Sequence, residues 1–302
     1  MRAPWIVAAC LIAGCNALLG ISDPAARTDG GSGSDGSGSD GSGSDGGGGD
    51  GPGDAQPPSG SPVLLSEVVL APNGSEMIEL VNTSPDVVDL SNYFLSDNGN
   101  YWRIPTGFQI QGTDGINDFV VQFPAGTLMP GHAVFTVAIA SSGEFQTAYG
   151  IPPTFSIASG TMLSITGGAA PNLTSGGEVI VLFFWDGASD LVQDADILLA
   201  GSPSAANALV AKSNAQQDGP DVDTATSAYK GDAETIPPIQ IGTPGAGLST
   251  KRILPEGGHE THDGTGNGLA GEDETTEDTD TTWDSGVFSI PDPGLVPAEL
   301  LL

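Results

Sequence analysis

Short apolar runs alternate with clusters of Gly, Pro, Asn and Asp along the chain from Val63 onward. One of these runs, EMIELV, alternates strongly, with Glu79 on the same side of an extended chain as Met77 and Val81. In an extended chain, Ile78 and Leu80 would face one side, and Met77 and Val81 would face the other. Repeated short strands separated by turn residues are typical of β-sandwiches, so the pattern predicts an all-β fold.

The same pattern gives approximate bounds for the strands. The expected strands cover residues 64–70, 76–81, 119–123, 132–140, 178–185 and 191–199, with a short pair within 87–97. Asp186 and Gly187 form a turn signal that predicts a hairpin between the last two strands. Residues 143–150 predict a helix of one or two turns.

Composition and charge narrow the range of functions. The chain has 302 residues, with 38 Asp and Glu against 7 Lys and Arg, which gives a formal net charge of −31. Because nucleic-acid binding depends on cationic contacts with phosphates, we expect no nucleic-acid partner. Two Cys exclude a disulfide framework and a cysteine-rich zinc site, and three His leave few groups for acid–base chemistry.

The first fifteen residues have the pattern of an export signal. Arg2 supplies one positive charge, and the apolar run from Trp5 to Ile12 is shorter than the roughly 20 residues that a membrane-spanning helix needs. The run ends in the tetrapeptide IAGC, which resembles the lipobox of bacterial lipoproteins. The resemblance implies that residues 1–14 are a signal peptide and that Cys15 carries lipid. The alternative is an ordinary secretory leader with an incidental cysteine.

The lipoprotein resemblance also implies a location. Asn16, and not Asp, follows Cys15, which favours the outer membrane over retention in the inner membrane. We therefore expect a lipid-anchored protein of the outer membrane, on the periplasmic face or the cell surface of a Gram-negative-type bacterium. Lipidation consumes the thiol of Cys15, so the processed chain keeps no free thiol for catalysis.

Two segments separate the expected anchor from the folded part. Residues 15–27 form an anchor-proximal segment, and residues 28–61 consist mostly of Gly, Ser, Asp and Pro, with GSGSD repeated three times. Such a composition buries too little surface to offset the entropy of ordering, so we expect a disordered linker with a reach of roughly 30–35 Å. The repeat lacks the closing Glu of an EF-hand, so we expect no calcium site in it.

The sequence between Leu65 and Asp97 resembles the lamin tail domain family. The shared pattern contains an E-x-I-E-L-x-N segment, a V-D-L segment and an aromatic L-S-D segment, and the motifs FPAGTLMPG and LTSGGEVIVLFFWDG continue it. The residues on this pattern are Glu67, Glu76, Glu79, Leu80, Asn82, Asp89, Leu90, Leu95, Ser96 and Asp97. The resemblance implies an immunoglobulin-like β-sandwich over residues 62–200.

Residues 201–302 are more acidic and more irregular. The motifs TKRI, GNG, GEDETTED and TW resemble the tail of lamin-tail-type lipoproteins from Gram-negative bacteria. This resemblance implies a long, loop-rich extension that packs on the sandwich or completes it with a last strand. The composition alone leaves a partly disordered acidic tail as the alternative.

A structural role is expected for the few bases and for two acids in turns. In so acidic a chain, Arg252 is expected to pair with carboxylates such as Glu256 or Asp273 and to attach the extension to the sandwich. Asp89 and Asp97 are expected to shape turns by accepting backbone N–H groups, and not to act as a general acid and base.

Two segments are candidates for metal binding. His259 and His262 stand three residues apart in a loop, whereas the zinc-binding helix of a metalloprotease needs a spacing of four, so we expect no zinc centre. His132 is expected at the surface, at the start of a strand, because no G-x-S-x-G motif supplies a nucleophile. An acidic run offers carboxylates suited to Ca²⁺, with a solvated loop as the alternative. The candidate calcium ligands are Glu272, Asp273, Glu274, Glu277 and Asp278.

These observations favour a non-catalytic protein of the cell envelope. Lipid on Cys15 would hold it to the membrane, and the linker would present a lamin-tail-like domain for binding or adhesion to a protein or an envelope polymer. A second hypothesis is a calcium-dependent adhesin that uses the acidic loops of the extension. A third is a metal-dependent hydrolase, which the shortage of His and thiols disfavours.

Overall fold

A computed structural model describes residues 61–201, 212–231, 241–260 and 266–301. The contacts within the chain define two compact units, residues 1–53 and 54–302, and every described residue belongs to the second. The expected signal peptide, Cys15 and nearly all of the expected linker lie outside the described residues. No described helix is both long enough and apolar enough to span a membrane.

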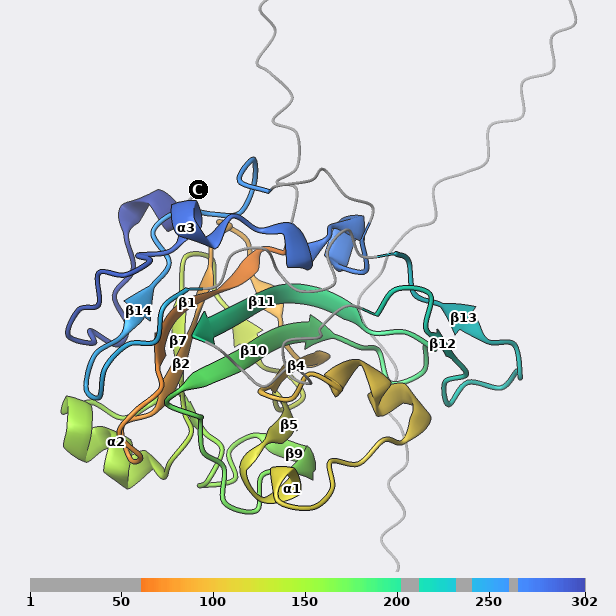
Figure 1. The fold of residues 1–302 in the computed structure, drawn as a ribbon, viewed down its shortest axis with the longest axis horizontal. Coiled ribbons are helices and arrows are strands. Elements are labelled where there is room, and N and C mark those ends of the chain that lie inside the picture. The colour runs from red at the N-terminus through yellow and green to blue at the C-terminus, as the bar shows by residue number, and fades with distance from the viewer. Residues whose placement is uncertain (1–60, 202–211, 232–240, 261–265, 302) are drawn as a thin grey trace, which may run out of the picture. The chain divides into compact units, whose positions relative to one another are not determined.

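Two five-stranded sheets form the body of this unit (Figure 1). The first sheet has the order β14–β1–β2–β7–β8 and is antiparallel except for the parallel pair β7–β8. Its strands are β14 (Thr250–Lys251), β1 (Val63–Val69), β2 (Met77–Asn82), β7 (Val134–Ala138) and β8 (Phe155–Ser156). The second sheet has the order β11–β10–β4–β5–β9 and is antiparallel throughout. Its strands are β11 (Gln193–Gly201), β10 (Gly177–Phe184), β4 (Tyr93–Ser96), β5 (Phe119–Gln122) and β9 (Leu163–Gly167).

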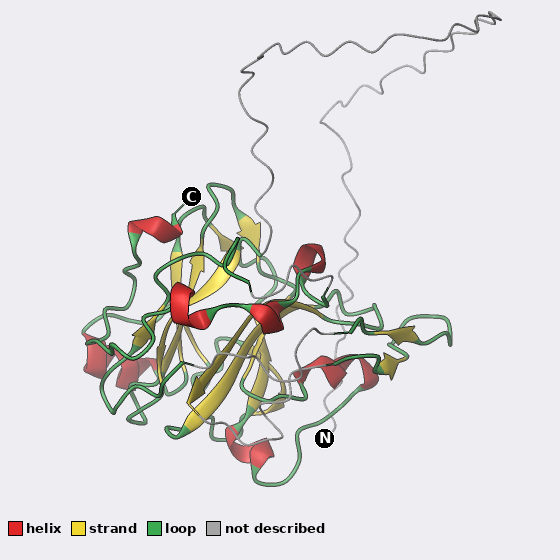
Figure 2. Ribbon diagram, turned by 45° about the horizontal axis from the view of Figure 1, so that its top comes forward, coloured by secondary structure: helices red, strands yellow, loops and turns green. Residues whose placement is uncertain are grey.

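Short elements surround the sheets, and Figure 2 shows the helices at the periphery of the strands. Two further strand pairs are β3 (Val88–Asp89) with β6 (Leu128–Met129) and β12 (Gln216–Gln217) with β13 (Ser227–Ala228). The α-helices are α1 (Asp114–Asn117), α2 (Ser142–Tyr149) and α3 (Thr279–Thr282). The 3₁₀ helices are η1 (Tyr101–Thr106), η2 (Leu269–Gly271), η3 (Glu274–Thr276) and η4 (Ala298–Leu300).

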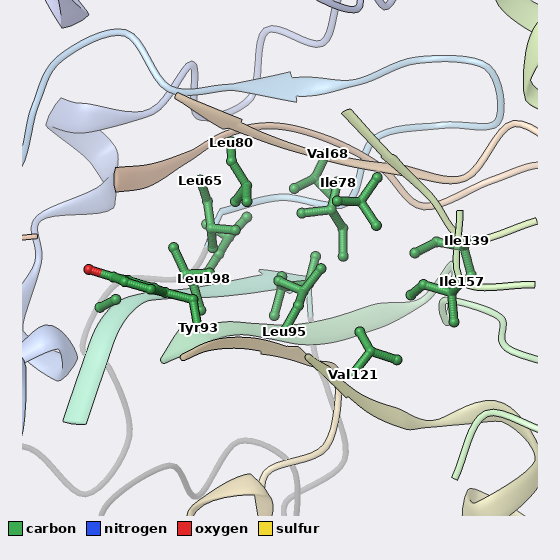
Figure 3. Packing of buried hydrophobic residues seen from close by; sticks show 14 of the residues in the cluster. Leu65, Val68, Ile78, Leu80, Tyr93, Leu95, Val121, Ile139, Ile157 and Leu198 are labelled. Carbon is green, nitrogen blue, oxygen red and sulfur yellow. The ribbon is translucent and has the colours of Figure 1, made fainter. Parts of the chain in front are cut away.

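The main hydrophobic core lies between the two sheets. Ile78 and Leu80 of β2 belong to it, together with Leu95 of β4 and Leu198 of β11, and Figure 3 shows these side chains converging. Burial of such side chains contributes roughly 1.5–3 kcal/mol each, which makes this contact the main source of stability. The alternation in EMIELV predicted that Ile78 and Leu80 share a face, and the structure places that face in the core.

The outer faces of both sheets are also covered. On the first sheet, Met77 packs with Phe145 of α2, and Val81 packs with Leu300 of η4. On the second, the outward-facing side chains of β4, β10 and β11 form a cluster with Tyr101 of η1 and other aromatic residues. Strands buried on both faces lose the apolar–polar alternation of a half-exposed sheet, which explains the continuous apolar run in β10.

The strand and helix predictions agree well with the structure at the level of elements. Each expected strand is present, and the predicted hairpin is formed by β10 and β11. The predicted helix is α2, which begins with a capping box: the Ser141 hydroxyl accepts from the Glu144 N–H, and the Glu144 carboxylate accepts from the Ser141 N–H. Within 87–97, β3 pairs with β6, whereas β4 enters the second sheet between β10 and β5.

The C-terminal segment, blue in Figure 1, lies beside β1 and β11. Its strand β14 pairs with β1 through Glu67–Lys251 and Val68–Thr250, which extends the first sheet by one strand. Single bridges join Asp194 to Gly268 and Ala200 to Ile241, so this segment also borders β11. Residues far beyond 201 therefore contribute to both sheets.

Candidate functional site

Arg252 occupies a buried site at the edge where the two sheets meet. It follows β14 directly, and its side chain is fully buried. Its Nη2 donates to both carboxylate oxygens of Asp196, at 2.9 and 2.8 Å, and lies 3.3 Å from Oε1 of Glu256. Its Nη1 donates to Glu277, and its Nε donates to the carbonyl of Leu65 at 2.8 Å. A guanidinium suits this position because its donors are fixed in a planar fork that matches several carboxylates at once.

An irregularity in β1 explains why charged groups enter this position. The register of β1 on β2 shifts between Leu65 and Glu67, and β14 pairs with β1 only at Glu67 and Val68. Side chains therefore provide hydrogen-bond partners for the backbone of Leu65. Its N–H donates to the carboxylate of Asp196 at 2.7 Å, and its carbonyl accepts from the guanidinium of Arg252. Buried backbone groups need such partners, so the ion pair also completes the sheet.

A second irregularity, in β11, places its two acidic residues on opposite faces. In a regular strand, Asp194 and Asp196 would share a face. Leu182 pairs with Asp196 and Phe183 with Asp194, so Ala195 is an extra residue that reverses the alternation. Asp196 consequently meets Arg252, whereas Asp194 forms a separate buried ion pair with Lys212.

Trp283 closes the Arg252 site from the C-terminal side. The Arg252 guanidinium carbon lies 4.9 Å from the centre of the Trp283 ring, and the ring is 1 % exposed. A bridge also joins the backbones of the two residues. A cation over an aromatic face in a water-poor site adds favourable electrostatic energy, so Trp283 and Arg252 hold each other in place.

The charges in this site perturb one another strongly. Burial disfavours the cationic form of Arg252, but Asp196, Glu277 and Glu256 together raise the pKa of the guanidinium above its usual range. Burial raises the pKa of Asp196 to about 6, although Arg252 opposes the rise. Burial and the neighbouring charge of Glu274 raise the pKa of Glu256 well above its ordinary value. When ionised, the carboxyl groups of this site therefore carry more negative charge than the single positive charge of Arg252 can neutralise.

Next to Arg252 the acidic side chains enclose a small space, which we call the acidic hollow. The hollow is too narrow to hold a water molecule. Glu256, Glu272 and Glu274 each place one carboxylate oxygen within 4.8 Å of the others. The lining residues are Glu256, Glu260, Glu272, Asp273, Glu274 and Glu277.

The structure distributes the candidate calcium ligands between two roles. Glu272, Asp273, Glu274 and Glu277 line the acidic hollow. Oδ1 of Asp273 accepts from the N–H and hydroxyl of Thr275, and Asp278 accepts from Thr281 outside the hollow. These two carboxylates therefore shape the backbone around η3 and α3.

The partners of Arg252 differ in part from those expected. Glu256 is one of them, but the closest carboxylates belong to Asp196 and Glu277, and no contact joins Arg252 to Asp273 in the described part of the chain. Asp196 was not singled out from the sequence. The sequence did contain a signal for Asp196, which stands in the apolar strand DILLA. An acidic side chain buried with such a strand needs a cation or hydrogen-bond donors as partners.

The remaining candidates have structural positions. Asp89 accepts from the N–H of Ser91 at 2.9 Å, as expected of a residue that shapes a turn, whereas Asp97 accepts from the N–H of Phe119 at 2.6 Å and so joins the end of β4 to the start of β5. His132 is exposed, with a φ of 57° in the turn before β7. His259 is half-buried, whereas His262 lies outside the described residues. Among the described residues, every group of potential metal ligands consists of carboxylates.

Two stacked sheets with a buried ion cluster at their edge define a β-sandwich domain of the immunoglobulin-like class. The family model of the Lamin Tail Domain matches residues 56–226, more than half of the chain, and the chain therefore belongs to this family. Both the family resemblance and the all-β immunoglobulin-like fold predicted from the sequence are confirmed.

Two further comparisons concern individual proteins. The crystal structure of a DUF4876 family protein from Bacteroides thetaiotaomicron is similar to the chain, with 14% identity, a TM-score of 0.40, and coverage of 79% of this chain and 75% of that chain. No curated protein matches the sequence.

Proposed function

We propose that the protein is a lipid-anchored component of the bacterial cell envelope that presents its lamin tail domain as a non-catalytic binding head. The observation that carries the proposal is the IAGC tetrapeptide at the end of a short apolar run, followed by a Gly/Ser/Asp segment and one β-sandwich. A lipid at Cys15 would fix the chain to a membrane, and the segment 28–61 would separate the sandwich from it.

A cleft beside the β10–β11 hairpin is the binding surface that this proposal favours. Its volume is about 620 Å³, within the range of ligand-binding clefts. Trp185 contributes aromatic surface, Tyr229 is almost fully buried in the wall, and Asp190, Lys230 and Asn267 contribute polar groups. Aromatic faces bordered by hydrogen-bonding groups suit the sugar rings of an envelope polymer, so we favour a polysaccharide ligand over a protein ligand.

The chemistry of the described residues supports a binding role over a hydrolytic one. A hydrolase needs a nucleophile beside a base, or a metal with an open coordination position. His132 is exposed in a turn, and His259 lies outside the cleft. The buried acids of the described part are engaged with Arg252, Lys212 or backbone groups, or line the acidic hollow.

The anchor is tested with the full chain expressed in a Gram-negative host. We expect the wild-type chain in the membrane fraction, with a mass that corresponds to loss of residues 1–14 and addition of lipid at Cys15. Cys15→Ala should abolish both changes, whereas the matched variant Cys10→Ala should leave them intact. An unmodified thiol at Cys15, or membrane association that Cys15→Ala leaves unchanged, would refute the anchor.

The binding head is tested separately, by sedimentation of the same chain with purified peptidoglycan sacculi and with lipopolysaccharide vesicles. Trp185→Ala should lower binding at least tenfold, because aromatic residues dominate binding energy in such clefts. Val287→Ala, at an exposed apolar residue outside the cleft, should have no effect. Binding of neither polymer, or equal binding by both variants, would exclude this cleft as a polysaccharide site.

A further inference from the structure

We propose that the acidic hollow binds a hard divalent cation, with Ca²⁺ the best fit, through the carboxylates of Glu256, Glu272 and Glu274. Ca²⁺ takes oxygen ligands, prefers several carboxylates and tolerates irregular geometry. The proposal does not depend on the lipid anchor.

The spacing of the carboxylates fits this ion. Ca²⁺ lies 2.3–2.6 Å from its oxygen ligands, so two ligands of one ion are at most about 5 Å apart. One oxygen from each of Glu256, Glu272 and Glu274 satisfies this limit, because all three lie within 4.8 Å of one another. Glu260 and Glu277 also line the hollow and provide further oxygens at its wall.

Glu274 supplies an independent observation. The residue is 7 % exposed, and its Oε1 is buried without a hydrogen-bond partner in the described part of the chain. A buried carboxylate oxygen without a partner costs at least 1–3 kcal/mol of stability. Because the hollow admits no water, hydration cannot offset this cost, and a small cation coordinated by that oxygen would.

Charge balance points to the same occupant. Asp196, Glu256, Glu272, Glu274 and Glu277 are five carboxyl groups, and the guanidinium of Arg252 forms ion pairs with three of them, Asp196, Glu256 and Glu277. With all six ionised, five negative charges and one positive charge leave a net charge of −4. This negative charge can be reduced in two ways. Some of the carboxylates can be protonated, or the carboxylates can bind a divalent cation.

A cation in the hollow would join separate parts of the C-terminal segment. Glu256 follows β14, whereas Glu272 follows η2 and Glu274 begins η3, and both η2 and η3 pack against β11. The ion would therefore fix the loop around η3 to the edge of the first sheet, next to the Arg252 ion pair. Loops tied down in this way unfold together with the sandwich, so ion binding should raise the melting temperature.

The test uses the full chain, freed of metal with EDTA and titrated with CaCl₂ by isothermal titration calorimetry. We expect one saturable site with a dissociation constant of about 10⁻⁵–10⁻⁴ M. At 10 mM CaCl₂ the melting temperature should rise by roughly 5–10 °C above that in NaCl of equal ionic strength. The NaCl arm removes the general effect of salt on a chain with a net charge of −31.

The variants separate this site from the other acidic residues of the chain. Glu274→Gln keeps the size of the side chain and should weaken Ca²⁺ binding at least tenfold, and Glu272→Gln should do the same. Glu299→Gln, at an exposed glutamate, should bind Ca²⁺ like the wild type. If Glu274→Gln does not fold, the heat of binding to the wild type and to Glu272→Gln still decides the outcome.

Two results would overturn the proposal. One is the absence of saturable Ca²⁺ binding and of a thermal shift in the wild type. The other is unchanged binding in both Glu274→Gln and Glu272→Gln, which would assign the ion to exposed acids. A parallel titration with MgCl₂ should give weaker binding, because Mg²⁺ demands octahedral geometry at 2.0–2.1 Å and keeps its waters.

Discussion

Arg252 shows how much can depend on one base in a chain with 38 acidic residues. Its guanidinium satisfies the carboxylate of Asp196, the carboxylate of Glu277 and the carbonyl of Leu65, and it packs on Trp283. Each of these groups is buried, so loss of Arg252 would leave Asp196 and Glu277 without a counter-charge and the Leu65 carbonyl without its side-chain donor. The residue therefore acts as a structural centre and not as a surface charge.

Replacing Arg252 should destabilise the protein strongly. We expect Arg252→Met to lower the free energy of unfolding by about 3–5 kcal/mol, because it leaves buried carboxylates without a counter-charge. Arg252→Lys should recover only part of this loss, since an ammonium cannot bond to several partners in one plane. The measurement is urea denaturation of the full chain. Arg103→Met, at an exposed guanidinium, is the control and should cost less than about 1 kcal/mol, and an equal loss in both variants would contradict this role.

At the scale of elements, buried acids mark the ends of strands in the second sheet. Glu178 is the second residue of β10 and accepts from the N–H of Thr174 at 2.7 Å. Asp97 follows β4, and Asp118 precedes β5. Asp97 and Glu178 accept from backbone N–H groups, and Asp118 accepts from the side-chain amide of Asn98 at 2.7 Å. Burial raises the pKa of Glu178 to about 8, and burial together with Glu178 and Asp118 raises the pKa of Asp97 well above its usual range.

The raised pKa of Glu178 predicts a loss of stability with rising pH. The folded state holds this proton more tightly than the unfolded chain, in which a glutamate titrates near its model value of 4.5. The stabilisation is therefore complete below about pH 4.5 and is lost as the pH rises through about 8. In EDTA, the melting temperature should fall between pH 5 and pH 8.5. Glu178→Gln, which carries no titratable proton, should reduce this fall.

The control for this prediction is Glu299→Gln, because Glu299 is exposed in η4. It should show the same pH dependence as the wild type. A melting temperature that rises with pH in the wild type, or an identical fall in Glu178→Gln, would show that Glu178 does not hold its proton in the folded state.

At the scale of the whole molecule, the described part of the C-terminal segment completes the sandwich. Strand β14 extends the first sheet, and Leu300 covers Leu64 and Val81 on its outer face. The carboxylate of Glu79 accepts from the N–H of Gly294 at 2.5 Å, and Lys251 forms ion pairs with Glu67 and Asp292. The sandwich and its extension therefore share one core.

Two truncations of similar length test this unity. A chain that ends at Leu248 should lose cooperative unfolding, because it exposes the edge of β1 and removes the counter-charge of Asp196. A chain that begins at residue 54 should keep the melting temperature of the full chain within about 5 °C, because residues 54–302 form one compact unit. Thermal unfolding of both truncated chains is monitored by near-ultraviolet circular dichroism, which reports the cooperativity and the melting temperature. A chain ending at Leu248 that melts like the full chain would make the extension dispensable.

The sequence by itself determined the strands, the helix α2 and the family, because these follow from local alternation, capping residues and short motifs. It also indicated Arg252 and the acidic run 272–278, because charged residues can be identified from the sequence without knowledge of the fold. Tertiary structure alone decided which acids meet. Asp196 and Arg252 are 56 residues apart, and an extra residue in β11 determines which face Asp196 occupies. Burial then sets the protonation of these carboxylates, and burial depends on packing between distant segments.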